Sequence, residues 1–437
     1  MCRFIYINFT VAMSNFLYGI DFGTTNSALS IYDEEKKEII KTIIVPSILY
    51  FQSEQSATEP LKYVVGDQAI SEYIKDGMKG RFMKSIKRIL PRSSFIETRI
   101  HNKKYNASDL VTLILKELKE KADEIIGLDC KKAIIGRPVF FDDDNTAKDA
   151  LAQKRLNKAA ENAGFEEVRF QFEPIGAAFA YEKTITKKEK VLVADLGGGT
   201  TDFTYLILDP AKVGDKDRRN DIIATGGIYI GGDSFDSAFM WDKGTPHFGK
   251  HTLYEAAPGK MLTVPVSLFA NICSWEQMNF FNGIKIKNDL QNYYHYSKQD
   301  RKFKNLLTLT DNNLGYSLFQ SVEKTKVELS SLEVSKFQYS KMDIEINDEI
   351  SIDQYNGIIQ KDLKKISAYL DDFLLKNQIS VADIDSLFLT GGTSMVTAIK
   401  DLFKTKFPNT PVHSGDNFIS VAKGLAYSGY LFEEPVS

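Results

Sequence analysis

A run of three glycines lies between two apolar segments in VLVADLGGGTTDFTYLIL, residues 191–208, and it limits the structures that this part of the chain can form. Each glycine loses more backbone freedom on folding than any other residue, so three in a row are costly inside a strand or a helix. The apolar and β-branched residues on both sides predict two strands joined by a tight turn. Asp195 precedes the turn and Asp202 follows it. The pattern therefore predicts a hairpin whose turn needs an unusually bare backbone.

A second stretch, FLYGIDFGTTNSALSIYD at 16–33, repeats this plan around a Gly-Thr-Thr-Asn turn. Asp21, Gly23 and the two threonines after it correspond to Asp195 and the glycines and threonines that follow that residue. Each hairpin opens a segment of mixed strands and helices. Two such segments predict a duplicated α/β domain with a cleft between its halves.

The remaining chain is divided by apolar periodicity and by helix-breaking residues. Residues 133–141 predict a buried strand, and 144–165 a helix that ends at Gly164. A strand, a Glu173-Pro174 corner and a helix follow, because proline suits the first helical position. Residues 321–333 and 354–378 have helical periodicity, and 384–407 predict a strand, a Gly-Gly turn and a helix. We expect lobe I over 13–188, with an insertion at about 50–110, and lobe II over 189–437, with an insertion at about 241–313.

Composition excludes several classes of function. The net charge of −3 gives no general attraction for nucleic acid or for an anionic membrane, and no run of 18 or more apolar residues predicts a transmembrane helix. Three widely spaced cysteines argue against a disulfide framework and favour a reducing cytoplasm. Residues 1–12 are interpreted as an N-terminal extension, with Met13 as the functional start.

Bare glycine turns let backbone N–H groups converge on an anion such as phosphate. The sequence has no G-x-x-x-x-G-K-[ST] motif, and the triple glycine leads into a strand rather than into the helix of a Rossmann turn. Two hairpins facing each other across a cleft could instead grip the β- and γ-phosphates of a nucleotide. Acids beside such turns would repel phosphate unless a cation intervened, so Asp21, Asp195 and Asp202 imply Mg²⁺ held through its water shell.

Five ordered segments carry a family resemblance: GIDFGTTNS, FEPIGAAFAYE, VADLGGGTTDFT, YIGGDSFDSAF and LTGGTS. Together they resemble the phosphate and adenosine motifs of the heat-shock protein 70 (DnaK-type) ATPase domain, over roughly residues 18–430. The resemblance implies an actin-like ATPase (ribonuclease H-like) fold of two duplicated lobes around a nucleotide cleft. It also implies a chain without the peptide-binding domain, similar to the short YegD-type members.

The resemblance assigns roles at the phosphate end. Asp21, Asp195 and Asp202 would organise Mg²⁺, its water shell and a monovalent ion such as K⁺. Lys87 would reach the γ-phosphate and position the attacking water, with Lys84 and Arg88 as rivals because all three would share one helical face. Glu173 would hold the metal's water shell beside the switch residue Pro174. Phosphate contacts would come from Gly23, Thr24, Thr25, Asn26, Gly197, Gly198, Gly199, Thr200 and Thr201.

At the nucleoside end, the resemblance assigns Gly231, Gly232 and Asp233 to the first adenosine motif, and Gly391, Gly392 and Thr393 to the second. Glu323 and Lys326 match the ribose-binding pair, and Ser330 matches a hydroxyl near adenine. The two arginines that sandwich adenine in the family fall at Val327 and Met395. Each lost cation–π contact is worth about 0.5–2 kcal/mol, so adenine preference is in question.

These residues predict an ATP- and ADP-binding protein that hydrolyses ATP slowly, with Lys87, Glu173, Asp195, Thr200 and Asp202 in catalysis. A chaperone role, with a protein client or co-chaperone as partner, follows from the resemblance alone. Two alternatives stay open. One is a small-molecule kinase of the sugar-kinase type, and the other is a nucleotide-sensing binding module with little hydrolysis.

Overall fold

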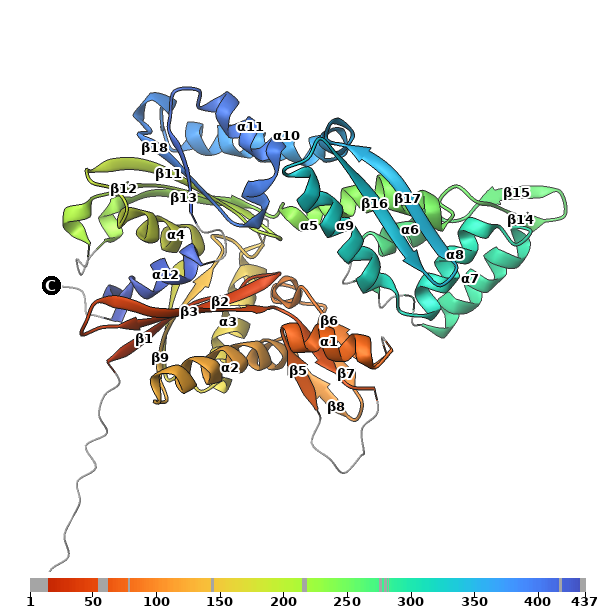
Figure 1. The fold of residues 1–437 in the computed structure, drawn as a ribbon, viewed down its shortest axis with the longest axis horizontal. Helices are drawn as coiled ribbons and strands as arrows, with labels where there is room; N and C mark the ends of the chain where they lie inside the picture. Colours follow the sequence, from red (N-terminus) through yellow and green to blue (C-terminus); the bar gives the residue numbers. More distant parts are fainter. Residues whose placement is uncertain are drawn as a thin grey trace, which may run out of the picture.

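The computed structural model describes residues 15–53, 62–77, 79–142, 145–213, 218–274, 277–278, 281, 283–415 and 419–432. The expected extension over 1–12 and the expected start at Met13 lie outside these residues. Figure 1 shows two large sheets on the left of the view and a group of helices and smaller sheets on the right.

The first large sheet is built on the hairpin of β1 (Phe16–Asp21) and β2 (Asn26–Asp33), which pair antiparallel with Asp21 opposite Ala28. β3 (Glu38–Pro46) continues the antiparallel side. β9 (Lys132–Arg137) and β10 (Glu167–Phe172) add parallel strands on the other side of β1. The strand order is therefore β3-β2-β1-β9-β10.

The second large sheet repeats this topology. β11 (Glu189–Leu196), β12 (Thr201–Leu208) and β13 (Ile222–Ile228) are antiparallel neighbours. β18 (Ser386–Thr390) and β19 (Val412–Ser414) extend β11 in parallel, which gives the order β13-β12-β11-β18-β19. In both sheets the third, second, first, fourth and fifth strands lie in that spatial order. The predicted duplication is confirmed, and the chain has the two-lobed actin-like ATPase fold.

Two helices lie between the large sheets, α4 (Glu173–Glu182) and α12 (Ser420–Ala426) (Figure 1). A side chain at Gly424 would place its Cβ only 1.5 Å from the carbonyl oxygen of Gly176, so the two helix backbones touch where they cross. Ile175, Val421 and Leu425 of these helices share one buried cluster with Val193 of the second sheet. This packing joins the two halves behind the cleft.

The first half also contains short strands and further helices. β4 (Leu49–Phe51), β5 (Tyr63–Val65) and β6 (Arg81–Met83) form one small sheet, and β7 (Thr98–Ile100) pairs with β8 (Lys103–Tyr105). The helices are α1 (Asp67–Lys75), α2 (Ala107–Ile126) and α3 (Thr146–Asn162). Asn106 and Asp109 form a capping box at the start of α2, which fixes where that helix begins.

The second half carries the elements on the right of Figure 1. They are α5 (Gly232–Phe239), α6 (Val266–Ile272), α7 (Ile284–Tyr296), α8 (Arg301–Asp311), α9 (Gly315–Leu329) and the hairpins of β14 (Leu253–Ala257) with β15 (Lys260–Thr263) and of β16 (Val334–Lys341) with β17 (Ile344–Ser351). α10 (Ile352–Lys376) and α11 (Thr397–Lys406) pack against the second sheet. The predicted lobe and insertion boundaries stay predictions.

Most expected elements are present, with shifted ends. The helix expected over 144–165 is α3, whose first turn is capped by Asn145; that expected over 321–333 is α9, and that over 354–378 is α10, capped by Ser351. The strand expected over 133–141 ends at Arg137, because Pro138 has no N–H for a ladder bond. The helix assumed for Lys84, Lys87 and Arg88 is wrong. β6 and a four-residue 3₁₀ helix, η1 (Ile86–Ile89), occupy that segment, with Ser85 in the left-handed region.

Candidate functional site

The turns of the two glycine hairpins face each other at close range. A Cβ atom at Gly198 would lie 3.3 Å from Thr25 Oγ1, and one at Gly199 would lie 3.3 Å from Thr24 Oγ1. Within the second turn the Gly197 N–H donates to the Thr200 carbonyl at 2.9 Å. A side chain on Gly198 or Gly199 would therefore press against the opposite hairpin, which explains why this turn has no side chains there.

A cavity of roughly 540 Å³ opens beside these turns and runs between the halves. Most of the residues assigned from sequence line it together: Asp21, Gly23, Thr24, Thr25, Asn26, Lys87, Glu173, Asp195, Gly197, Gly198, Gly199, Thr200, Gly232, Asp233, Glu323, Lys326, Val327, Ser330, Gly391, Gly392, Thr393 and Met395. The fold thus gathers residues from distant parts of the sequence into one wall. Their individual roles stay predictions.

Three assigned residues lie behind this wall rather than on it. The buried Thr201 hydroxyl donates to the Ile230 carbonyl at 2.8 Å. Gly231 packs on the second turn, because a Cβ there would lie 2.6 Å from the Gly198 carbonyl oxygen. Asp202 is buried, and its Oδ1 accepts the Val139 N–H at 2.9 Å. These residues support the turn from below and do not face the cavity directly.

The three cations of the 84–88 segment point to different acids. Lys87 Nζ contacts Glu173 Oε1 at 2.6 Å, and both side chains are about nine-tenths buried. Arg88 lies 3.3 Å from Asp233, and Lys84 lies 3.5 Å from Glu323. Burial lowers the pKa of Lys87, but the charges of Glu173 and Asp21 outweigh it, so that pKa is raised. Lys87 is therefore held as an ammonium beside the carboxylates of Glu173 and Asp21.

Those carboxylates strongly affect one another. Burial raises the pKa of Asp195 to about 8, with Glu173 as the next cause. Burial and the charge of Glu173 also raise the pKa of Asp202 to about 7, against the hydrogen bond from Val139. Asp21 shifts in the same direction for the same two reasons. Since Lys87 supplies only one positive charge, this end of the cavity favours a further cation.

The donor set fits Mg²⁺ bound through water. Asp202 Oδ2 is buried and has no hydrogen-bond partner among the described residues, so one acceptor is left unsatisfied behind the cavity wall. Within the described ranges, no three Asp, Glu, His or Cys side chains stand close enough together to ligate an ion directly. Mg²⁺ usually keeps several waters and takes one or two carboxylates, so an outer-sphere site on Asp21, Asp195 and Asp202 suits it.

Residues of both adenosine-type motifs fix the wall beside the glycine turn. Thr393 Oγ1 donates to the Gly197 carbonyl at 2.8 Å, and the Asp233 N–H donates to the Gly198 carbonyl at the same distance. Gly391 has a φ of 81°, and a Cβ there would lie 2.3 Å from the Leu196 carbonyl oxygen. Only glycine fits this approach of the β18 turn to the hairpin.

The far end of the cavity differs in character. Lys326 Nζ pairs with Asp236 at 2.8 Å, while Val327 and Met395 are 61% and 46% exposed. Sequence reasoning did not single out Asp236, which lies one helical turn after Asp233 in the same motif, and that i+3 spacing was the available signal. Further lining residues that it missed are Ser331, Val396 and Val421. In the portion of the chain that is described, no helix combines the length and apolarity needed to span a membrane.

Comparison with known proteins agrees with this geometry. The family model described as "Hsp70 protein" matches residues 17–252 and 281–434. Chaperone protein DnaK of Ureaplasma urealyticum serovar 10 is 26% identical over 427 residues, and that of Thermotoga petrophila is 27% identical over 428 residues. DnaK of Mycoplasmopsis synoviae is 24% identical over 422 residues. Each alignment covers 94% of this chain, which spans 58% of the length of the relative. Because the family model covers most of its length, the chain belongs to the Hsp70 family.

Proposed function

We propose that this chain binds ATP with Mg²⁺ in the central cavity and hydrolyses it slowly to ADP. The observation that carries the proposal is the meeting of two bare hairpin turns with the buried Lys87–Glu173 pair and the carboxylates of Asp21 and Asp195 at one end of that cavity. Phosphate oxygens need many N–H and hydroxyl donors, and the turns supply both. The acids need a cation, which a magnesium nucleotide would bring with it.

In this reaction a water oxygen bonds to the γ-phosphorus while the bond to the β–γ bridging oxygen breaks, so ADP, inorganic phosphate and a proton result. Thr24 and Thr200 would donate their hydroxyls to phosphate oxygens, and Lys87 would hold the γ-phosphate and the attacking water. Glu173 fixes Lys87 in place through the 2.6 Å contact. Bound Mg²⁺ would supply charge neutralisation at the phosphates. Positioning and electrostatics would thus provide most of the catalysis.

Asp195 and Asp202 are the candidates for orienting the attacking water. The two residues lie directly opposite each other in the antiparallel register of β11 and β12. Asp195 lines the cavity, whereas Asp202 lies behind it, and its Oδ2 has no hydrogen-bond partner in the described part of the chain. We assign the direct contact to Asp195 and a positioning role to Asp202.

A nucleotide-sensing module with little hydrolysis is the second candidate. The specific observation in its favour is the exposed pair Val327 and Met395 at the base end, where a cation could have stacked on a purine. Weak base binding would leave the phosphates as the main recognition element. Such a module would close on nucleotide without efficient turnover.

Turnover of ATP by the purified chain, followed with γ-labelled substrate, separates the two candidates. The ATPase proposal expects Lys87→Ala and Asp195→Asn to reduce turnover by roughly 10²–10³-fold, the usual loss for one group that stabilises a transition state. Lys104→Ala serves as the control, because that lysine is 65% exposed and pairs with Glu97 on the surface. Equal turnover in all four proteins would contradict the assigned site.

Partners are proposed by family only. The relatives are named chaperone proteins, so we propose that nucleotide state controls contact with a protein client or co-chaperone in the cytoplasm. A pull-down performed with ATP and again with ADP tests this. Proteins retained in one state and lost in the other support the proposal, and identical sets in both states contradict it.

A further inference from the structure

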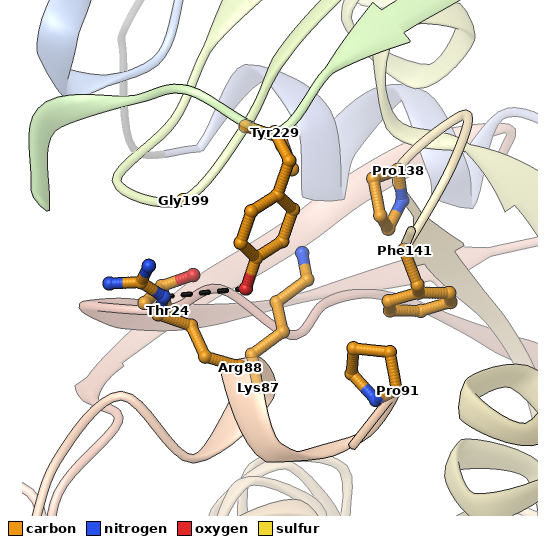
Figure 2. A pocket seen from close by; sticks show the side chains of 9 residues that line it. Thr24, Lys87, Arg88, Pro91, Pro138, Phe141, Gly199 and Tyr229 are labelled. Carbon is orange, nitrogen blue, oxygen red and sulfur yellow. Dashed lines mark hydrogen bonds between the residues drawn. The ribbon is translucent and has the colours of Figure 1, made fainter. Parts of the chain in front are cut away.

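A second, much smaller cavity lies beyond the phosphate end of the central cavity. Its volume is about 20 Å³. The residues that line it are Thr24, Lys87, Arg88, Pro91, Pro138, Phe141, Gly199, Thr200 and Tyr229. Four of these residues, Thr24, Lys87, Gly199 and Thr200, also line the central cavity. In Figure 2, Lys87 rises between Tyr229 on one side and Pro138 and Phe141 on the other. We call this small cavity the throat.

A third cavity, of about 550 Å³, lies on the other side of the throat. It shares Arg88, Pro91, Phe141 and Tyr229 with the throat. The central cavity, the throat and this outer cavity therefore form a row in which each member shares side chains with the next. The throat has room for about one water molecule, which needs at least ~10–15 Å³, and is too narrow for a phosphate ion as it stands.

Tyr229 and Arg88 close the throat from one side. Arg88 Nε donates to the Tyr229 hydroxyl at 3.3 Å, and the guanidinium carbon lies 5.5 Å from the centre of the tyrosine ring. Figure 2 marks the hydrogen bond and shows the ring directed down toward η1. The 3.3 Å contact of Arg88 with Asp233 joins the same group to the start of α5. This closure links the first half of the chain to the second.

The opposite side of the throat is fixed within the first half. Arg155 of α3 donates to the carbonyls of Leu90, Arg92 and Phe95 at 2.8–2.9 Å, which anchors the loop that carries Pro91. Tyr229 instead directly follows β13 of the second sheet. A relative movement of the halves, or a rotation of the Tyr229 side chain, would therefore widen the throat while Pro91 stays in place.

The outer cavity has the chemistry of a site for a doubly charged oxyanion. Arg88, Arg92 and Lys148 bring three positive charges to it, and Ser93 and Ser94 bring hydroxyl groups. Asp142, the acidic residue in its wall, pairs with Lys148 at 2.9 Å. The balance of charge in this wall is positive.

We propose that inorganic phosphate formed by hydrolysis leaves through the throat into the outer cavity, with Tyr229 and Arg88 as its gate. The inference rests on the proposed function. ADP would occupy the central cavity between the γ-phosphate position and its mouth, so the product phosphate would be enclosed at the inner end. The shared residues Lys87, Thr24 and Thr200 place that inner end directly against the throat.

A single-turnover experiment on the full chain tests the gate. Acid quenching of γ-labelled ATP measures bond cleavage, and a fluorescent phosphate sensor measures release into solution. For Tyr229→Ala we expect cleavage within about twofold of wild type and release faster by about fivefold, equivalent to ~1 kcal/mol of barrier. Tyr229→Phe, which keeps the ring but loses the hydroxyl, should be intermediate. Tyr296→Ala is the control, since that tyrosine is 53% exposed on α7.

Phosphate uptake gives a second measurement that needs no hydrolysis. The chain is loaded with Mg·ADP, labelled inorganic phosphate is added, and the bound label is followed by rapid filtration. We expect faster uptake in Tyr229→Ala and slower uptake in Lys148→Gln, which removes a charge from the outer cavity. Wild-type rates in both variants would overturn the proposed route. Absence of cleavage in every protein, together with these uptake changes, would contradict the ATPase proposal and still support the route.

Discussion

Replacement of Lys87 by methionine should reduce both stability and turnover, and the two losses should be separable. The side chain is 11% exposed, its partner Glu173 is 8% exposed, and their charged atoms are 2.6 Å apart. Methionine fills a similar volume without the charge. The variant therefore leaves Glu173 among Asp21, Asp195 and Asp202 with no cation beside it.

The expected loss of unfolding free energy is about 3 kcal/mol, the lower end for one broken buried pair, because cavity water can solvate the carboxylate left behind. Turnover should fall by roughly 10²–10³-fold, since one preorganised group at a developing charge is worth about 2.7–4 kcal/mol. The double variant Lys87→Met/Glu173→Gln removes the remaining unpaired charge. It should recover much of the lost stability and none of the lost turnover.

Urea denaturation without nucleotide measures the first quantity, and γ-labelled ATP turnover measures the second. Recovery of turnover together with stability in the double variant would show that Lys87 acts only through folding. A single variant as stable as wild type would show that the pair does not hold a buried charge. Either result would contradict a catalytic role for Lys87 in a buried ion pair.

Three further predictions concern other parts of the molecule. Burial and the charge of Glu173 raise the pKa of Asp195 to about 8 and that of Asp202 to about 7, so the stability that these groups contribute is present below pH ~4 and is lost as pH rises through 7–8. The melting temperature measured without metal should therefore decrease from about pH 5 to about pH 9, and Mg·ADP should make this decrease smaller. A melting temperature that rises over this range would contradict the assignment. Val327→Arg should tighten ATP binding by about 2- to 30-fold in calorimetry through one restored cation–π contact, and unchanged affinity would place the base elsewhere. Gly424→Ala should destabilise the chain by about 3 kcal/mol in urea, because its Cβ would meet a carbonyl of α4 at 1.5 Å, while Gly357→Ala, in open space on α10, should stabilise it by about 0.5–1 kcal/mol; equal stability would contradict the close helix crossing.

The duplicated architecture could be predicted because it depends on local chemistry that repeats. Each hairpin has apolar strands, a bare turn and an acid before it, so the sequence around Asp21 and Asp195 shows the repeat directly. The parallel strands β9, β10, β18 and β19 then follow the same order in both halves. Helix ends were shifted by a few residues where caps such as Asn145 and Ser351, rather than periodicity, decide the start.

The distribution of the basic residues could not be predicted from spacing. Lys84, Lys87 and Arg88 have helical intervals, but Ser85 adopts a φ of 59° and interrupts any continuous helix. Each of the three cations then pairs with a different acid from a distant element: Lys84 with Glu323, Lys87 with Glu173 and Arg88 with Asp233. Charge partners so far apart in sequence leave no local signal.

The sequence also did not predict which of the motif residues are buried and which line the cavity. Thr201 and Asp202 belong to the glycine motif, yet both are buried behind the turn, where Thr201 bonds to the Ile230 carbonyl and Asp202 to the Val139 N–H. Tyr229 belongs to a segment assigned to the nucleoside end, and the fold places it beside Arg88 and the two glycine turns. A motif fixes which residues gather, and the packing of the two halves decides which of them face the cavity.

Calorimetric titration of ATP onto the purified chain, with Mg²⁺ and with a chelator, is the most direct test of a cavity built to hold a magnesium nucleotide between two hairpins. We predict saturable binding of one nucleotide per chain with Mg²⁺, and much weaker binding when the metal is removed, because Asp21, Glu173 and Asp195 then line the cavity beside the phosphates without a divalent cation to screen them. No binding heat with Mg²⁺ at several temperatures, or equal affinity with and without the metal, would contradict the account.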